Sequence, residues 1–278
     1  MSMLTTNAKS SFLPDQIEAL VVKPVIAASV AIQAVGSTAV DGNVVRVPIV
    51  DAFPTASWTD EGAEIVASDA SLGEVASGFY KLAGLSIVSS ELAEDSNPDI
   101  LNIVGQGLSN DIAASLDKAF FGSHGKTLNM PKGLKDLTGV NKVTGALANL
   151  DVFLEAIYGA QGVGANLATF VANPADALKI AKLKESTSSN RGLVQPDPTR
   201  PGVSQVSGVP VLPSPAVTEG EIWGLPGAGR VVVAIRKGTE LATSSDAMFT
   251  SDRLAIRATM RAAFLFPHEA AIQKITLS

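Results

Sequence analysis

The longest regular pattern in the chain is the stretch SNPDILNIVGQGLSNDIAASLDKAFFG, which runs from Ser96 to Gly122. Ser96 and Asn97 are candidates for a helix cap, Pro98 suits the first helical position, and Asp99 places an acid in the first turn. Apolar residues then recur every three or four positions: Ile100, Ile103, Val104, Leu108, Ile112, Leu116 and Phe120. At about 1.5 Å per residue, the pattern predicts a helix roughly 30 Å long that forms the spine of the fold.

The first 42 residues are predicted to form an N-terminal arm. Ile17, Leu20 and Val21 recur at helical spacing, but Pro24 interrupts the pattern and the segment has no second apolar layer. A short helix of this kind is stabilised mainly by what it packs against. We therefore expect the arm, residues 1–42, to lie along a neighbouring chain.

Residues 43–89 are predicted to form a long hairpin. Side chains alternate in the strand-like run Val45–Ile49, and Gly78–Ser89 is predicted to be the returning strand. The segment between them, Phe53–Glu74, is rich in small and polar residues. Isolated two-stranded ribbons are marginally stable in water, so we expect this hairpin to rest on another subunit.

Residues 133–250 are predicted to form an α/β domain, because helical and strand-like patterns alternate there. The expected helices are Leu150–Gln161 and Ala175–Glu185, the second of them capped by Asn173. The Ser- and Pro-rich stretch Thr187–Ser207 is predicted to be an exposed loop. The expected strands are Ala168–Ala172, Val209–Leu212, Glu221–Leu225 and Val231–Arg236.

The C-terminal residues 251–278 are predicted to be strands that return to the sheet beside the long helix. Apolar and polar residues alternate from Arg253 to Phe266. Arg253, Arg257 and Arg261 fall on one face of this strand because they are four positions apart, which is an even step. They could contact nucleic acid or the acids of an adjacent chain. The net charge of −6 favours a protein partner.

The composition is apolar for a chain that shows most of its surface to water. Hydrophobic residues make up 46% and charged residues 17%, yet no run reaches the roughly 20 apolar residues of a membrane-spanning helix. We therefore expect no membrane contact and burial against other protein chains. The absence of cysteine excludes disulfides and thiolate metal sites, and fits a reducing cytoplasm. His124 and His268 are too few for a metal or acid–base site by themselves, so no cofactor, metal or catalysis is expected.

The hairpin carries a group of acids that has two interpretations. Asp60, Glu61 and Glu64 could act as a hydrolase pair, but an exposed hairpin lacks the buried environment that separates two carboxyl pKa values. Pairing with arginines of a neighbouring subunit is the favoured interpretation. Trp58, just before these acids, is interpreted as a packing residue at the same contact.

The order of these elements resembles that of tailed-phage major capsid proteins, the Hong Kong 97 coat fold that encapsulin shells share. The resemblance runs from about Leu13 to Leu277, and its short motifs are each weak but occur in the family's order. They are Val47-Pro48, Trp58–Gly62, Lys81-Leu82, Val88–Leu92, Leu116–Gly122, Gly208–Val211 and Asp252–Arg261.

The resemblance implies an α+β fold of named parts. These are an N-terminal arm (1–42), an extended hairpin loop (43–89), a peripheral domain with the spine helix (90–132, completed by strands from 251–278) and an axial α/β domain (133–250). It implies a coat protein that self-assembles as hexamers and pentamers into an icosahedral shell around phage DNA, without reading its sequence. Assembly in the host bacterial cytoplasm, a separate scaffolding protein, a portal and decoration proteins are further implications.

One departure from the family concerns covalent cross-linking. The prototype joins subunits by an isopeptide bond between a hairpin Lys and an Asn near the C-terminus. Here no Lys lies between Lys23 and Lys81, and no Asn follows Asn190. We therefore expect a shell without cross-links. An encapsulin-like compartment that encloses a cargo enzyme, and an enzyme that uses Asp60, Glu61 or His268, are the alternative functions.

Overall fold

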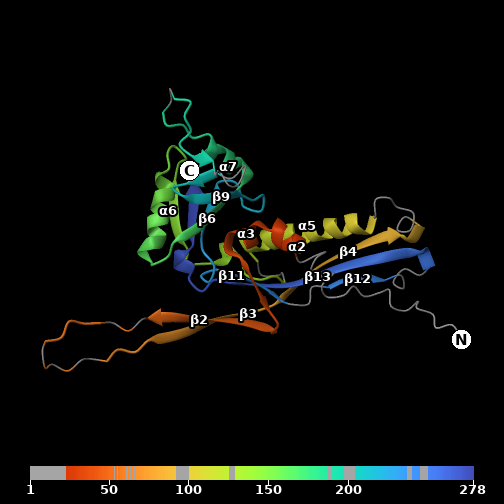
Figure 1. The fold of residues 1–278 in the computed structure, drawn as a ribbon, viewed down its shortest axis with the longest axis horizontal. Helices are drawn as coiled ribbons and strands as arrows, with labels where there is room; N and C mark the ends of the chain where they lie inside the picture. Colours follow the sequence, from red (N-terminus) through yellow and green to blue (C-terminus); the bar gives the residue numbers. More distant parts are fainter. Residues whose placement is uncertain are drawn as a thin grey trace.

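In the computed structural model of the chain, the described residues are 23–52, 54, 56–60, 62, 64, 67–91, 100–124, 129–186, 189–196, 204–236, 240–244 and 250–278. They form two larger β-sheets, a long helix laid along the first sheet, and a two-stranded hairpin that reaches outward (Figure 1). The expected α+β class is confirmed. No helix within these ranges is long and apolar enough to cross a membrane.

The long helix, α5, runs from Ile100 to Phe121, and its expected cap at residues 96–99 lies outside the described residues. Its 22 residues correspond to a length of about 33 Å. Ile103, expected on the apolar face, is 51% exposed, whereas Val104 and Leu108 pack against the core. The expected face is confirmed in the second half of the helix, where the fully buried residues include Ile112, Leu116 and Phe120.

The first sheet is built around one long strand, β13 (Arg253–Leu265). Its other strands are β4 (Tyr80–Ser89), β12 (Glu240–Ser244), β11 (Val232–Arg236) and β1 (Ser37–Val40). β4 is antiparallel to β13 along one edge, and β12 and then β11 pair antiparallel with the other edge. Even-numbered residues of β13 face α5, and the ring of Phe264 packs edge-on against Phe120 with centroids 5.2 Å apart.

The second sheet has seven strands in the order β5, β14, β10, β6, β9, β8, β7. Helices α6 (Asp151–Gly162) and α7 (Pro174–Ala181) pack on one face, in a core with Phe170 and Ile222. The other face, with Trp223, shares the central core with α5. The strands are β5 (Asn141–Gly145), β14 (Gln273–Leu277), β10 (Glu221–Pro226), β6 (Leu167–Ala172), β9 (Val209–Pro213), β8 (Ser204–Val206) and β7 (Gln195–Pro196).

The hairpin consists of β2 (Val44–Ala52) and β3 (Ser71–Gly78). The prediction that Gly78–Ser89 is its returning strand is therefore wrong. Tyr80–Ser89 is β4, which pairs with β13 over ten residues. The physical reason is burial: one face of β4 finds an apolar partner in α5, with Gly84 so close to the Leu108 side chain that a Cβ would lie 2.9 Å from it.

Three other strands lie in a different sheet from the one expected. β11, expected as a strand of the α/β domain, and β12, whose residues were assigned to that domain without a predicted strand, belong to the sheet beside α5, where Val233 and Ile235 are buried. β14, expected beside β13, pairs with β10 and β5 in the seven-stranded sheet. Ile275 of β14 is fully buried in the core under α6. Local alternation is the same in either sheet, so only the packing separates the two outcomes.

The prediction for the arm is wrong for its described part. Helices α2 (Lys23–Ala28) and α3 (Val30–Val35) pack inside their own chain, and β1 then pairs with β11. Val25 and Ala31 are fully buried in the central core. The second apolar layer that the segment lacks in sequence is supplied by α5 and both sheets. Residues 1–22 lie outside the described residues.

Candidate intersubunit surface

The hairpin places its aromatic and acidic residues in solvent. Trp58 is fully exposed, and Asp60 and Glu64 are exposed as well. Glu61 lies outside the described residues. Between Arg46 and Lys81 the sequence contains no Lys or Arg but has six acids, which are Asp51, Asp60, Glu61, Glu64, Asp69 and Glu74. Glu74 Oε1 lies 3.0 Å from Arg46, whereas no ion pair is found for Asp60, Glu64 or Asp69 among the described residues.

The three predicted arginines lie on one face of β13, as expected. The antiparallel register places Arg253 opposite Ser89, Arg257 opposite Leu85 and Arg261 opposite Lys81. All three arginines are exposed. Because directly paired residues of an antiparallel ladder share a face, the odd-numbered side chains of β4 and β13 form one surface on the side of the sheet away from α5.

Sequence reasoning missed the β4 half of this surface. Lys81 adds a fourth cation, and Leu85 and Ile87 are exposed by 64% and 42%. We call these residues, with Arg253, Arg257 and Arg261, the basic face. The sequence signal was weak, because Leu82-Ala83 and Ile87-Val88 put apolar residues on both faces of the strand, and assigning the segment to the hairpin concealed which strand lies beside it.

The same side of the sheet is already covered at its other end. There Ala263 and Leu265 of β13 are buried under the root of the hairpin, in a cluster that includes Val45, Val47 and Val75. The hairpin-root cluster contains no described residue of β13 before Ala263, and along this face the small residues Thr259 and Ala255 are buried between the exposed Arg261, Arg257 and Arg253. The layer built by the hairpin root therefore stops where the basic face begins.

The basic face brings like charges together. Arg261 and Lys81 are direct cross-strand neighbours, and like charges in that position are destabilising. Among the described residues, no ion pair to an acid is found for Lys81, Arg253 or Arg261. An anionic partner laid on this face would relieve the repulsion, and Leu85 and Ile87 would supply apolar contact beneath it.

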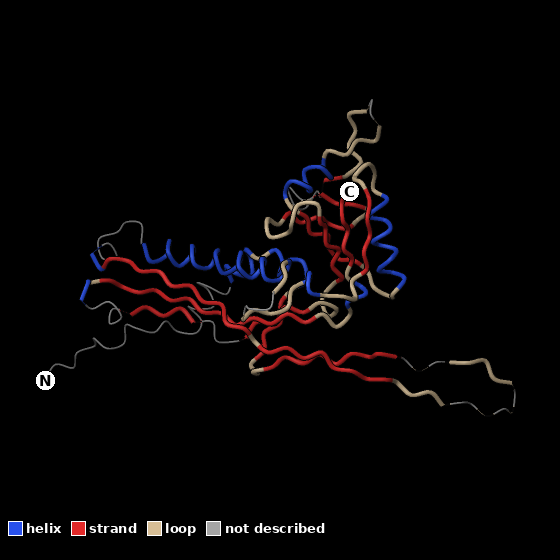
Figure 2. Tube along the Cα trace, turned by 180° about the vertical axis from the view of Figure 1, so that it is seen from behind, coloured by secondary structure: helices blue, strands red, loops and turns tan. Residues whose placement is uncertain are grey.

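The structure does not bring the acids and the arginines together within one chain. The hairpin strands β2 and β3 reach away from the body of the molecule, whereas β4, β13 and α5 extend in the opposite direction (Figures 1 and 2). Any contact between the hairpin acids and a basic face of this kind has to be made between two copies. No group of three or more described His, Asp or Glu residues is arranged to hold a metal ion.

A buried carboxylate holds the N-terminal segment onto α5. Asp117 accepts hydrogen bonds from the Ser29 hydroxyl at 2.6 Å, from Val30 N at 2.9 Å and from Ala31 N at 3.0 Å. Ser29 is itself the N-cap of α3. Burial raises the pKa of Asp117, although the three hydrogen bonds counteract part of that effect. Sequence reasoning overlooked Asp117 because its partners are far away in the chain.

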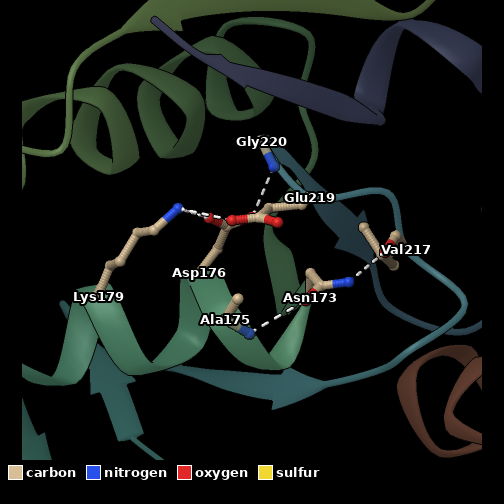
Figure 3. Close-up of polar contacts among 7 residues, drawn as sticks. All are labelled: Asn173, Ala175, Asp176, Lys179, Val217, Glu219 and Gly220. Atoms are coloured by element: carbon tan, nitrogen blue, oxygen red, sulfur yellow. Dashed lines mark hydrogen bonds and ion pairs between the residues drawn. The ribbon is translucent and has the colours of Figure 1, made fainter.

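A second polar cluster attaches α7 to the turn before β10 (Figure 3). Asn173 caps the helix, as predicted, by accepting from Ala175 N at 3.0 Å, and its amide donates to Val217 O at 2.8 Å. Asp176 is fully buried and accepts from Gly220 N at 2.6 Å. Lys179 lies 2.8 Å from Asp176 and 3.1 Å from Glu219. The cluster is structural, since each of its polar groups is occupied by another.

Glu221 connects two parts of the chain at the start of β10. Its two carboxylate oxygens lie 2.8 Å from Lys135 and 2.8 Å from Lys274. Burial raises the pKa of Glu221, but the hydrogen bonds from the two lysines outweigh it, so the pKa is below its ordinary value. Lys274 also lies over the Trp223 ring, 5.4 Å from its centroid.

Residues 10–277 match the model of the phage capsid family. The chain belongs to the phage capsid family. As a member it is a major capsid protein that forms an icosahedral shell. The match spans nearly all of the 278 residues, in agreement with the resemblance found in the motifs. No protein with a curated description matches the chain in sequence.

Solved capsid structures share the fold. The capsid of an empty GTA particle is 19% identical with a TM-score of 0.71, and the match covers 90% of each chain. A structure from Microbacterium phage Oxtober96 is 17% identical, with a TM-score of 0.73 and coverage of 100% and 96%. One from Mycobacterium phage Adephagia is 15% identical, with a TM-score of 0.72 and 90% of each chain covered. These matches do not favour the encapsulin alternative.

Proposed function

We propose that this capsid protein builds its shell by laying the acidic hairpin of one copy over the basic face of the next. The observation that carries the proposal is charge complementarity between two surfaces that cannot meet within one chain. A hairpin stretch with six acids and no base faces a sheet surface with four cations. Trp58 provides an exposed aromatic anchor, and Leu85 and Ile87 provide apolar area to receive it.

The layer made by the hairpin root supports this arrangement. Each copy already covers Ala263 and Leu265 with its own hairpin strands. A neighbour's hairpin placed on Arg261, Arg257 and Arg253 would continue the same layer along β13. Contacts of this kind tolerate small changes of angle, because long side chains adjust more easily than a packed core. That tolerance suits a shell in which one chain occupies both hexamers and pentamers.

The resemblance to the family adds further parts to the proposal. The shell encloses DNA without sequence-specific contacts, since the cations of the basic face are used by the neighbouring hairpin. It is held by non-covalent contacts alone, and it forms in the host cytoplasm with a separate scaffolding protein and a portal. Decoration proteins would bind the finished shell. The chain acts as a structural protein and not as an enzyme.

A charge-swap series tests the docking contact. We expect Arg253→Glu with Arg261→Glu to abolish shells, and Asp60→Lys with Glu64→Lys to do the same, because each places like charges in contact. The four substitutions together should restore assembly, since the charges are then exchanged and complementary again. Lys182→Glu, an exposed change at the end of α7, is the matched control and should assemble normally. Electron microscopy and sedimentation measure the outcome.

The result that would overturn the docking contact is normal shells from both reversed variants. If both reversed variants fail to assemble and the variant with all four substitutions also fails, the two surfaces do not meet each other. A folded subunit in each case is established by circular dichroism. A separate deletion of residues 54–69, closed by a Gly-Ser turn between β2 and β3, should leave the subunit folded and prevent stable shells. Unfolding of that variant would mean that the hairpin tip belongs to the folding core.

A further inference from the structure

The chain passes between its two larger sheets three times between α5 and β14; residues 125–128 of the first passage lie outside the described residues. Residues 122–140 lead from α5 to β5, residues 227–231 lead from β10 to β11, and residues 266–272 lead from β13 to β14. These crossings are where one sheet could change its angle to the other. Both sheets contribute to the central core, and side chains that tie the crossings to each other add to that joint.

Two adjacent residues of the third crossing tie it to the other two. His268 Nδ1 lies 2.7 Å from the Arg230 guanidinium, in the second crossing. Arg230 also donates to the carbonyl oxygen of Gly164 at 2.6 Å, in the turn after α6. Glu269 Oε2 accepts from the backbone N–H of Gly139 at 2.8 Å, in the first crossing. All three crossings are thus connected through His268 and Glu269.

The contact between Arg230 and His268 requires a neutral imidazole. Arginine has only donors, so Nδ1 must accept and the ring proton must sit on Nε2. Arg230 is the charged group in contact with the ring. Glu269, the next residue, directs its carboxylate to Gly139. Burial lowers the pKa of His268, and the positive charge of Arg230 lowers it further. The contact therefore persists at neutral pH and is lost only under more acidic conditions.

We propose that His268 is a pH-sensitive clasp that sets how tightly the two sheets of the subunit are joined. Protonation at Nδ1 removes the acceptor of Arg230 and places two cations at hydrogen-bonding distance. Arg230 then separates from the ring, and the second and third crossings can move relative to each other. A shell of such subunits becomes more deformable under acid without any change at its contact surfaces. The proposal rests on the fold of one chain and is independent of how hairpins dock.

The test compares wild type with two variants by hydrogen exchange, corrected for the intrinsic pH dependence of the amide rates. His268→Asn keeps an acceptor near the Nδ1 position but does not titrate, and His268→Ala has no acceptor. Opening of residues 163–166 and 227–231 in wild type should increase about tenfold or more between about pH 7.5 and about pH 5, because one charge-assisted hydrogen bond is lost. His268→Asn should show no such step, and His268→Ala should be open at both values.

An equal acid response in wild type and His268→Asn would overturn the clasp, since other titrating groups would then account for it. Amides of α5 between Val104 and Ile112 serve as an internal reference, because this part of the helix lies away from its C-terminal end at Phe121, where the first crossing begins. If His268→Ala fails to fold, the comparison of wild type with His268→Asn still decides. Shells and unassembled subunits should give the same difference between variants, which separates this result from any failure of the docking proposal.

Discussion

Replacing Asp117 by alanine should destabilise the subunit more than any surface change in the same helix. The carboxylate is 6% exposed and satisfies three donors, the Ser29 hydroxyl and the backbone N–H groups of Val30 and Ala31. Alanine leaves all three donors without this acceptor, two of them buried and the Val30 N–H half-buried. Each orphaned donor costs about 1–3 kcal/mol. Because such costs are not additive, we expect a total of about 3–5 kcal/mol, comparable to breaking a buried ionic contact.

The assay is thermal and denaturant unfolding of the unassembled subunit. For a chain of this size a loss of that magnitude lowers Tm by roughly 10 °C. Asp117→Asn should be intermediate, at about 1–2 kcal/mol, because it keeps one acceptor oxygen but turns a donor toward one N–H group. Asp111→Asn is the matched control: the residue is an exposed acid in the same helix, and its replacement should change Tm little.

The pH dependence gives an independent check. Burial raises the pKa of Asp117, so the native state holds a proton that the unfolded state has already released. The part of the stability that comes from the raised pKa is complete below the ordinary Asp range and is lost as the pH rises through the raised pKa. The margin of wild type over Asp117→Asn should therefore shrink as the pH rises. If Asp117→Ala unfolds with the wild-type midpoint, the attachment of α3 to α5 does not depend on this carboxylate and the reasoning fails.

Three further predictions concern other contacts. Shells boiled in detergent should give a single 28.6 kDa band on a denaturing gel, because no Lys precedes Lys81 in the hairpin and no Asn follows Asn190; a ladder of multimers would contradict this. Glu221→Gln should lower the free energy of unfolding by about 1–2 kcal/mol at neutral pH. Because the pKa of Glu221 is lowered in the fold, this stability is present above the ordinary Glu range and is lost as the pH falls through the lowered pKa. The free energies of unfolding of the variant and wild type should therefore converge in acid and not in base. Asn173→Ala should cost about 0.5–2 kcal/mol by uncapping α7, with calorimetry as the measurement and Asn190→Ala as the exposed control.

Local chemistry determined the elements that stand out in the sequence. The apolar repeat of α5, the cap of α7 at Asn173 and the alternation of β13 each depend on neighbours within a few residues, so they can be found without knowing the rest of the chain. The common face of Arg253, Arg257 and Arg261 follows from the period of a strand alone. Even the membership of the phage capsid family could be anticipated from short motifs in the right order.

Tertiary structure decided which elements meet. The pattern of Tyr80–Ser89 is equally suited to a hairpin strand and to a sheet strand, and only burial against α5 assigned it to β13. The same applies to β14, whose Ile275 is buried beneath α6. The sequence of residues 23–40 did not indicate that this segment packs inside its own chain. The residues that hold it are distant in sequence: Asp117 and its three donors are 86 to 88 positions apart. The period of the side chains is a local property of the backbone, whereas the free energy of burial depends on surfaces that come together from distant segments. For that reason the pairing of the strands, the contact between Arg230 and His268 and the basic face emerged only in the fold.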